Sequence, residues 1–227
     1  MSVSFLRHAG WFGPEDAKTL SIIGVGATGS WIGLLAAKMG FHKLQVWDGD
    51  FVEDHNLPNQ IYESRHVGQS KVDAFEDVLK QFNPAIQIEK HNRYFATEHD
   101  KELLNTEGPL VLTVDTMAAR KDIYESFYLN WKVNKVFETR LGFDYGELNV
   151  IDNMNTNVLK EWRSSLRSDE EIPDGPCNMR ICTTLVGMVA SYTVHSMCAM
   201  LSPKTKDMSL KKKTIFNLNP TLETYSI

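Results

Sequence analysis

A glycine-rich loop between a buried strand and a helix constrains this chain more than any other feature. Residues 24–29 read Gly-Val-Gly-Ala-Thr-Gly and follow a short apolar run that is rich in β-branched side chains. Gly24 permits a tight turn, Gly26 lets the backbone approach a phosphate, and Gly29 allows close packing of helix on strand. The helix predicted over 30–39 would offer unpaired N–H groups to an anion at its amino end. The pattern predicts a nucleotide-binding α/β fold.

The order of the predicted elements extends this expectation to the whole chain. Strand-like runs alternate with helical periods through the first half, which predicts a mostly parallel sheet covered on both faces. We therefore expect an α/β fold with a Rossmann-like, doubly wound, mostly parallel sheet and an antiparallel C-terminal extension. The predicted strands are 20–25, 44–47, 85–88, 109–115, 135–141, 147–151 and 214–218, and the predicted helices are 30–39, 70–82, 99–105, 117–131 and 185–201.

Composition excludes several classes of protein. The formal charge of −5 and the lack of a Lys/Arg-rich stripe argue against a nucleic-acid binder. The longest apolar stretch, 185–201, contains Ser, Tyr, Thr and His, so we expect a buried helix and no membrane span. The N-terminus also lacks the regions of a signal peptide. Three cysteines, Cys177, Cys182 and Cys198, are too few for a disulfide framework, so we expect a cytoplasmic protein without structural zinc.

An acidic residue follows the second predicted strand. Asp48 lies 22 positions after Gly26, where such a carboxylate usually accepts hydrogen bonds from ribose hydroxyls. This arrangement suits NAD and ATP equally. The glycine loop and Asp48 therefore leave open both an oxidoreductase and an enzyme that transfers a nucleotidyl group.

A series of short polar motifs lies between residues 48 and 120. Its members are Asp48 and Asp50; Asn56, Asn59 and Gln60; Gly68 and Lys71; Asn83 and Pro84; and Thr113, Asp115 and Arg120. In this order the motifs resemble those of the ThiF/MoeB family, the adenylating fold of ubiquitin-activating enzymes. The resemblance covers residues 20–120 well and continues loosely through 185–200.

The resemblance implies an activity and its cofactors. Members of the family join a carboxylate, normally the C-terminal glycine of a ubiquitin-like or sulfur-carrier protein, to AMP from ATP. It implies ATP and Mg²⁺ as cofactors and a homodimer as the assembly. Lys71 would reach the phosphates, Asp115 would hold Mg²⁺, Asp48 would fix the ribose, and Asn56 would contact the phosphate or sugar edge. The implied nucleotide-binding set is Gly24, Gly26, Gly29, Asp48, Asp50, Asn56, Asn59, Gln60 and Lys71.

One position departs from the family pattern. Asn59 stands where the family motif has an arginine, which removes a phosphate-binding cation. Arg65 in the same loop, Arg7 in the N-terminal segment and Arg140 at a strand end are candidates to replace it. Without such a replacement the protein would bind nucleotide and not catalyse adenylation.

A cysteine in the acidic segment before the long helix is a candidate nucleophile. Cys177 lies near the place where family members that form thioesters or persulfides keep their cysteine. Its thiolate would take the adenylated carboxyl group and release AMP, and the neighbouring Arg180 would favour that thiolate. An unreactive, partly buried cysteine is the alternative interpretation.

Together these features predict one ThiF-like adenylation domain over residues 1–227. We expect a nucleotide-binding half at about 18–132 and a partner-binding half at about 133–227. The predicted function is ATP-dependent activation of the C-terminal carboxylate of a ubiquitin-like protein, a sulfur carrier or a peptide. A catalytically silent family member that acts as a scaffold is the first alternative, and an NAD-dependent oxidoreductase is the second.

Overall fold

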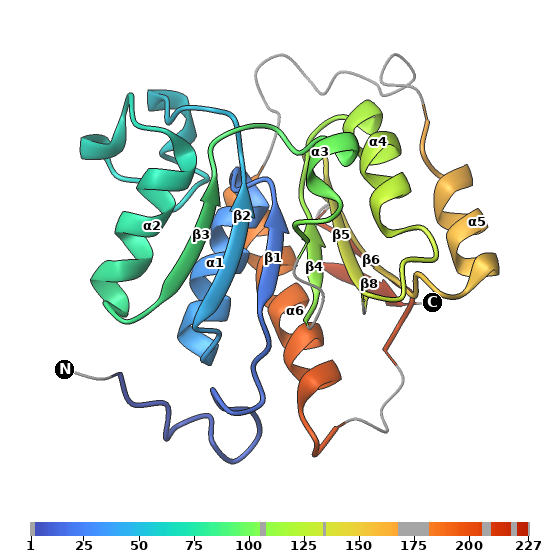
Figure 1. Ribbon diagram of the computed structural model, residues 1–227, viewed down its shortest axis with the longest axis horizontal. Helices are drawn as coiled ribbons and strands as arrows, with labels where there is room; N and C mark the ends of the chain where they lie inside the picture. Colours follow the sequence, from blue (N-terminus) through green and yellow to red (C-terminus); the bar gives the residue numbers. More distant parts are fainter. Residues whose placement is uncertain are drawn as a thin grey trace.

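The computed structural model describes residues 3–104, 108–133, 135–167, 182–205, 210–218 and 222–226. Within these residues eight strands form one sheet in the order β3-β2-β1-β4-β5-β6-β7-β8 (Figure 1). The strands are β1 (Leu20–Ile23), β2 (Lys43–Trp47), β3 (Gln87–His91), β4 (Leu110–Leu112), β5 (Val136–Leu141), β6 (Tyr145–Ile151), β7 (Lys213–Asn217) and β8 (Glu223–Ser226). The helices are α1 (Ala27–Met39), α2 (Lys71–Phe82), α3 (Thr97–Asp100), α4 (Met117–Phe127), α5 (Thr156–Ser164) and α6 (Thr183–Leu201).

The sheet is parallel in its first half and antiparallel in its second. Strands β3, β2, β1, β4 and β5 all run in the same direction. Strands β6, β7 and β8 then follow as an antiparallel extension at the other edge. The expected fold class is therefore confirmed.

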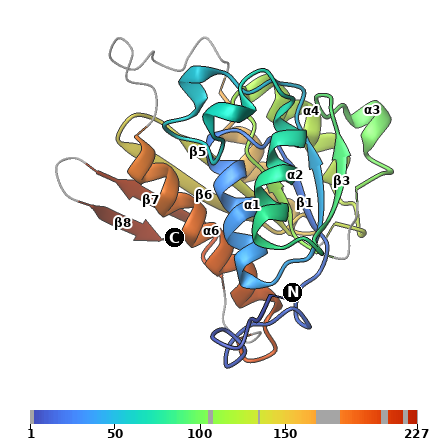
Figure 2. The same cartoon turned by 90° about the vertical axis from the view of Figure 1, so that its left-hand side faces the viewer.

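Helices cover both faces of the sheet, as the buried apolar run of a central parallel strand requires. One core packs α1, α2 and α6 against the sheet, and Figure 2 shows these three helices together on one side. A second core lies on the opposite face and includes side chains of α4 and α5. Strand β1 is buried along its whole length between the two cores.

Two helix ends agree with the local sequence signals. Gly40 ends α1 in the left-handed region at φ 113°, where its N–H reaches the carbonyls of Ala36 and Ala37. Ser70 caps α2, since its hydroxyl oxygen accepts a hydrogen bond from the N–H of Asp73 at 3.3 Å. These two caps fix where α1 ends and where α2 begins.

Several element boundaries differ from the prediction. Strand β3 begins two residues later than expected and reaches His91. Its bounds are unclear in the sequence because it is an edge strand whose side chains are mostly exposed. Helix α3 is only Thr97–Asp100. The prediction missed α5 although it buries Leu159 and Trp162, and it missed β8, whose four residues are all exposed and show no apolar alternation.

Helix α6 has the length and apolarity of a membrane-spanning helix, and 56% of its apolar window is buried inside the fold. Its side chains pack into the same core as α1 and the sheet, with Leu185, Val189 and Met197 fully buried there. The apolarity of α6 thus matches its position in the core. Cys182 lies at the N-cap of α6 and is half-buried, whereas Cys198 lies within the helix and is buried.

Candidate functional site

A cavity of about 1010 Å³ lies at the carboxyl ends of the parallel strands. Its walls come from the loops that follow β1, β2, β3 and β4 and from the first turns of α1, α2 and α4. The sheet order places β2 on one side of β1 and β4 on the other, so the chain changes direction across the sheet at this point. Ligands of open α/β sheets bind at such a switch point. The size suits a nucleotide.

The glycine loop forms the floor of the cavity between β1 and α1. Gly24 has a φ of +93°, which side chains rarely adopt, and a Cβ on Gly29 would lie 2.0 Å from the carbonyl oxygen of Gly24. A Cβ on Gly26 would meet nothing within 4 Å, so the space beside its backbone is open. Thr113, which directly follows the neighbouring strand β4, holds the loop in place, since its hydroxyl donates to the Gly24 carbonyl at 2.6 Å. The loop thus exposes backbone to a ligand at the amino end of α1.

Asp48 ties the loop after β1 to the loop after β2. Its Oδ2 accepts a hydrogen bond from the N–H of Val25 at 2.8 Å, and its Oδ1 accepts one from the N–H of Asp50 at 2.9 Å. Burial raises the pKa of Asp48 above its ordinary value, and the charge of Lys71 offsets only part of the rise. Asp48 is 7% exposed and lines the cavity. Each oxygen keeps a second lone pair for a hydroxyl donor.

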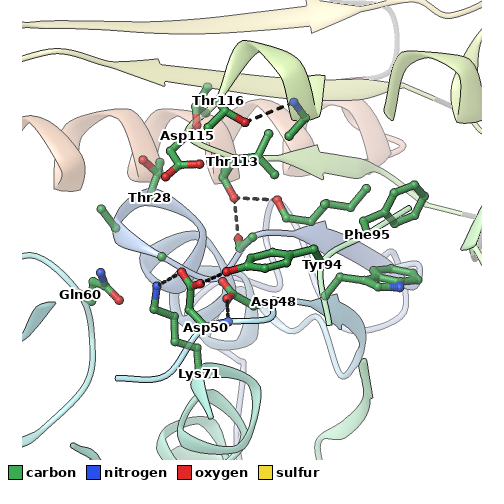
Figure 3. Close-up of a pocket in the computed structure, with 18 of the residues that line it drawn as sticks. Thr28, Asp48, Asp50, Gln60, Lys71, Tyr94, Phe95, Thr113, Asp115 and Thr116 are labelled. Carbon is green, nitrogen blue, oxygen red and sulfur yellow. Dashed lines mark hydrogen bonds and ion pairs between the residues drawn. The ribbon is translucent and has the colours of Figure 1, made fainter. Parts of the chain in front are cut away.

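Lys71, Asp50 and Tyr94 form a chain of polar contacts across the cavity (Figure 3). The Lys71 Nζ lies 2.7 Å from the Asp50 Oδ2, and the Tyr94 hydroxyl donates to the Asp50 Oδ1. Burial alone would raise the pKa of Asp50, but the hydrogen bonds from Lys71 and Tyr94 outweigh it and lower that pKa. The bond to Asp50 in turn raises the pKa of Tyr94 to about 12. Tyr94 therefore remains a donor at neutral pH.

Asn56, Asn59 and Gln60 line the wall beside α1. The Asn56 Oδ1 accepts from the N–H of Glu53 at 3.0 Å, and the Asn59 carbonyl accepts from the Trp31 indole at 3.1 Å. The side-chain oxygens of Asn59 and Gln60 are buried without a hydrogen-bond partner among the described residues. Buried polar atoms are normally satisfied, so this part of the wall fits a polar ligand.

Asp115 and Arg120 form the wall beyond β4. Asp115 is exposed in the loop that joins β4 to α4, and Thr116 caps that helix by accepting from the N–H of Ala119 at 3.2 Å. Arg120 is buried, with its Nε 2.7 Å from the Glu138 Oε1 and its Nη2 donating to the Thr139 carbonyl at 3.1 Å. Both Asp115 and Arg120 line the cavity.

The structure does not bring two of the other predicted cations, Arg65 and Arg140, to the cavity. Arg65 lies on the outside of its loop, with its Nε 2.7 Å from Glu63 and its Nη2 2.8 Å from Asp77. Arg140 is directed toward α5, where its guanidinium donates to Ser165. Neither arginine is among the described residues that line the cavity.

The reason for the placement of Arg140 is the alternation of side chains along a strand. Its neighbours Thr139 and Leu141 line the cavity, so Arg140 between them faces the other side of β5. The predicted nucleophile, Cys177, lies outside the residues that the structure describes.

Two aromatic residues of the site were not predicted. Tyr94 and Phe95 follow β3 and line the cavity. The prediction ended that strand at Ile88, whereas it continues to His91. With the later end, a search for polar side chains just after a strand, the position in which Asp48 was found, would also have indicated Tyr94.

The charged residues of the cavity show what kind of metal site it could form. Three carboxylates, Asp48, Asp50 and Asp115, line it together with two strong cations, Lys71 and Arg120. The described residues contain no group of three or more His, Cys, Asp or Glu side chains that could hold a metal by themselves. Mg²⁺ is usually held by one or two carboxylates together with substrate phosphates. The exposed carboxylate of Asp115 fits that kind of site.

Curated relatives match parts of the chain. The ubiquitin-like modifier-activating enzyme 5 of Caenorhabditis elegans is 40% identical over 75 residues, which are 33% of this chain and 18% of that protein. The adenylyltransferase and sulfurtransferase MOCS3-2 of Zea mays is 32% identical over 115 residues, which are 48% of this chain and 24% of that protein. The matches thus span less than two thirds of the relatives' length.

Solved structures share the fold over most of the chain. PaaA superposes on this chain with a TM-score of 0.72 at 18% identity, and the superposition covers 94% of this chain and 64% of the PaaA chain. The Escherichia coli protein MccB, solved with ATP, superposes with a TM-score of 0.73 at 13% identity and covers 94% of this chain and 65% of that one. A model of the ThiF family matches residues 15–226, and the chain therefore belongs to the ThiF family.

Proposed function

We propose that this protein is an ATP-dependent adenylyltransferase that activates the C-terminal carboxylate of a ubiquitin-like protein, a sulfur carrier or a peptide. One observation supports this most: a single cavity combines the glycine loop at the start of α1 with Lys71 from the first turn of α2 and Asp115 from the loop before α4. The alternative of an NAD-dependent oxidoreductase assigns no role to that lysine and carboxylate together. The similarity to a ubiquitin-like modifier-activating enzyme and to an adenylyltransferase supports the same function.

In the proposed reaction a carboxylate oxygen attacks the α-phosphorus of ATP. The bond from that phosphorus to the oxygen bridging to the β-phosphate breaks, and acyl-AMP and pyrophosphate result. Negative charges meet in this step, so positive charge must stabilise the transition state. Lys71, Arg120 and the amino end of α1 supply it from this chain. Mg²⁺, held by Asp115 with the phosphates, would neutralise further charge.

The remaining residues of the cavity would bind the nucleotide. Asp48 presents both carboxylate oxygens at the end of β2 and would accept from the ribose hydroxyls. Asn59 and Gln60 would face the nucleotide, where their buried side-chain oxygens would accept hydrogen bonds from its hydroxyl or amino groups. Asp50 would hold Lys71 in place through their ion pair.

A second step is proposed from the sequence. The Cys177 thiolate would attack the acyl carbon of acyl-AMP, the carbon–oxygen bond to AMP would break, and a thioester and free AMP would result. A Cys177→Ala variant would then still form acyl-AMP and fail to form a reductant-sensitive conjugate. A thioester that persists in that variant would place the nucleophile elsewhere.

The assembly and location are also proposals. The family resemblance supports a homodimer with the partner bound by the half of the chain from about residue 133. The few cysteines favour the cytoplasm.

One observation favours a catalytically silent binding protein as the second candidate. Asn59 replaces the arginine of the family motif, and neither Arg65 nor Arg140 is found among the described residues of the cavity wall. Such a protein would bind Mg-ATP and not exchange pyrophosphate. A measurement of ATP binding together with pyrophosphate exchange therefore separates the two candidates.

The experiment combines calorimetric titration with a test of turnover. Mg-ATP and NAD are titrated separately, and ATP–pyrophosphate exchange is then measured with a panel of ubiquitin-like and sulfur-carrier proteins that end in glycine. We expect ATP to bind, NAD not to bind, and exchange to occur with one member of the panel. Binding of NAD alone would contradict both candidates, whereas ATP binding without exchange across the panel would support the silent one.

A further inference from the structure

An exposed aromatic ring lies on the wall of the cavity, and such rings are common in ligand-binding pockets. Tyr94 is 71% exposed, and its ring lies beside the Asp48–Asp50 turn (Figure 3). Large apolar side chains are more often buried, and an exposed one on a concave surface marks a contact with a ligand. The role of the Tyr94 ring is not explained by the proposed contacts to ribose and phosphate.

The loop that carries Tyr94 is anchored on both sides of it. Arg93 pairs with the buried carboxylate of Asp100, which also accepts a hydrogen bond from the N–H of Ala96 at 2.9 Å. Phe95 packs edge-on against Trp47 with 5.4 Å between the ring centroids. Tyr94 is therefore presented on a fixed backbone, as a preorganised binding residue requires.

Gly49 lets the Tyr94 ring approach the turn after β2. A Cβ on Gly49 would lie 3.1 Å from the Tyr94 ring and 3.0 Å from the Tyr94 nitrogen. Both distances are shorter than normal contacts, so a Cβ at this position would push the backbone and ring of Tyr94 away by a few tenths of an ångström. The hydroxyl then fixes the outer end of the ring by its bond to Asp50.

The strand order gives the direction in which a nucleotide would lie. The phosphates belong at the amino end of α1, after β1, and the ribose belongs at the acidic residue after β2. The next strand outward in the sheet is β3. The base of a nucleotide laid along this line reaches the loop after β3, which carries Tyr94 and Phe95.

We propose that Tyr94 binds the base of the nucleotide, with its ring stacked on the face of the purine and its hydroxyl held by Asp50. This inference rests on the proposed function, because it assumes a nucleotide in the cavity. A tyrosine ring stacks on any purine, so Tyr94 would contribute affinity for the nucleoside part more than discrimination between purines.

The experiment compares a complete nucleotide with a ligand that has no base. Calorimetric titration with Mg-ATP and with Mg-tripolyphosphate is done on the unsubstituted chain and on Tyr94→Ala. Loss of a stacking aromatic typically weakens binding by about tenfold or more. We therefore expect the Kd for Mg-ATP to rise about tenfold in Tyr94→Ala, with little change for Mg-tripolyphosphate.

Three further variants sharpen the result. Tyr94→Phe keeps the ring and should bind Mg-ATP more tightly than Tyr94→Ala. Gly49→Ala shifts the ring without touching the ligand, so it should weaken Mg-ATP binding less than Tyr94→Ala does. Trp131→Ala removes another exposed aromatic, 79% exposed and outside the residues that line the cavity, and should leave both affinities unchanged.

Two outcomes would overturn the inference while leaving the proposed function intact. The first is an affinity of Tyr94→Ala for Mg-ATP within about twofold of the unsubstituted chain, against the tenfold loss expected from stacking. The second is an equal loss of affinity for Mg-tripolyphosphate, which would place Tyr94 at the phosphates. Failure of the unsubstituted chain to bind Mg-ATP would contradict the proposed function and the inference together.

Discussion

The parallel and antiparallel halves of the sheet place polar side chains in different ways. After β2, β3 and β4 the chain carries Asp48, Tyr94 and Asp115, and all three line one cavity because parallel strands end at the same edge. At the border between the halves, on the last parallel strand β5 and the first antiparallel strand β6, the polar residues Glu138 and Asn149 lie within the strands and bond to each other at 2.8 Å inside the fold. A strand end therefore predicts a site residue only in the parallel half.

Two arginines bound to one carboxylate show the difference most directly. Glu138 is fully buried and accepts from the Nε of Arg120 at 2.7 Å and from the Nε of Arg140 at 2.8 Å. Arg120 comes from α4 and reaches the cavity, whereas Arg140 comes from β5 itself and faces α5. Glu138 thus joins the site of the parallel half to the interior of the antiparallel half.

The largest expected effect follows from removal of the shared carboxylate charge. Glu138→Gln leaves the buried Arg120 and the half-buried Arg140 without their anion, and breaking a buried ion pair in this way costs about 3–5 kcal/mol. We expect the free energy of unfolding in urea to fall by that amount. A decrease below about 1 kcal/mol, the range of exposed pairs, would show that the two arginines find other partners.

The same variant tests the pH dependence of stability. Burial alone would raise the pKa of Glu138, but the charges of Arg120 and Arg140 outweigh it and lower that pKa below 4.5. A carboxyl group whose pKa is lower in the folded chain than in the unfolded chain stabilises the fold at every pH above its unfolded-state pKa. This stabilisation is lost as the pH falls through the pKa of the folded state. The melting temperature of the unsubstituted chain should therefore fall more steeply below pH 4.5 than that of Glu138→Gln.

The next effect concerns turnover in the parallel half. Lys71→Ala removes the buried ammonium group of the cavity and should lower the rate of ATP–pyrophosphate exchange by about 10²–10³. Lys80→Ala is the matched control, because Lys80 lies on the same helix and pairs with Glu76 on its outer side at 2.7 Å. Similar rates for the two variants would remove Lys71 from the proposed mechanism.

The parallel half was the more predictable one from sequence. The glycine loop, Asp48 and Lys71 each stand beside a strong local signal: a buried β-branched strand, a strand end and the Ser70 cap. Their positions in space follow because every parallel strand ends at the same edge. Tyr94 escaped prediction because edge strand β3 has mostly exposed side chains and no clear end in the sequence.

The arginines were harder to place for a different physical reason. Sequence spacing gives the positions of Arg65 and Arg140 along the chain but not the side of the loop or strand they occupy. Arg65 is held outward by Glu63 and Asp77, the second of which lies on α2, six residues past Lys71. Such partners are known only once the helix and the loop are placed against each other.

A smaller effect should separate the two arginines that share Glu138. Arg120→Ala and Arg140→Ala each remove one partner of a buried carboxylate, so both should destabilise the fold by about 1–3 kcal/mol. Only Arg120 lines the cavity, so only Arg120→Ala should weaken Mg-ATP binding, by roughly tenfold for a lost charged hydrogen bond. Equal losses of ATP affinity, measured by calorimetry, would show that Arg140 also acts on the ligand.

The smallest effect is expected at Arg65, and it tests whether this loop arginine replaces the one missing at position 59. Its two ion pairs with Glu63 and Asp77 lie at the surface, where such pairs contribute little to stability. Arg65→Ala should therefore leave both the exchange rate and the Kd for Mg-ATP unchanged. A large loss of exchange with an unchanged melting temperature would mean that Arg65 leaves its partners and enters the cavity when nucleotide binds. In that case the cation missing at Asn59 would come from the same loop, and the silent alternative would lose its main support.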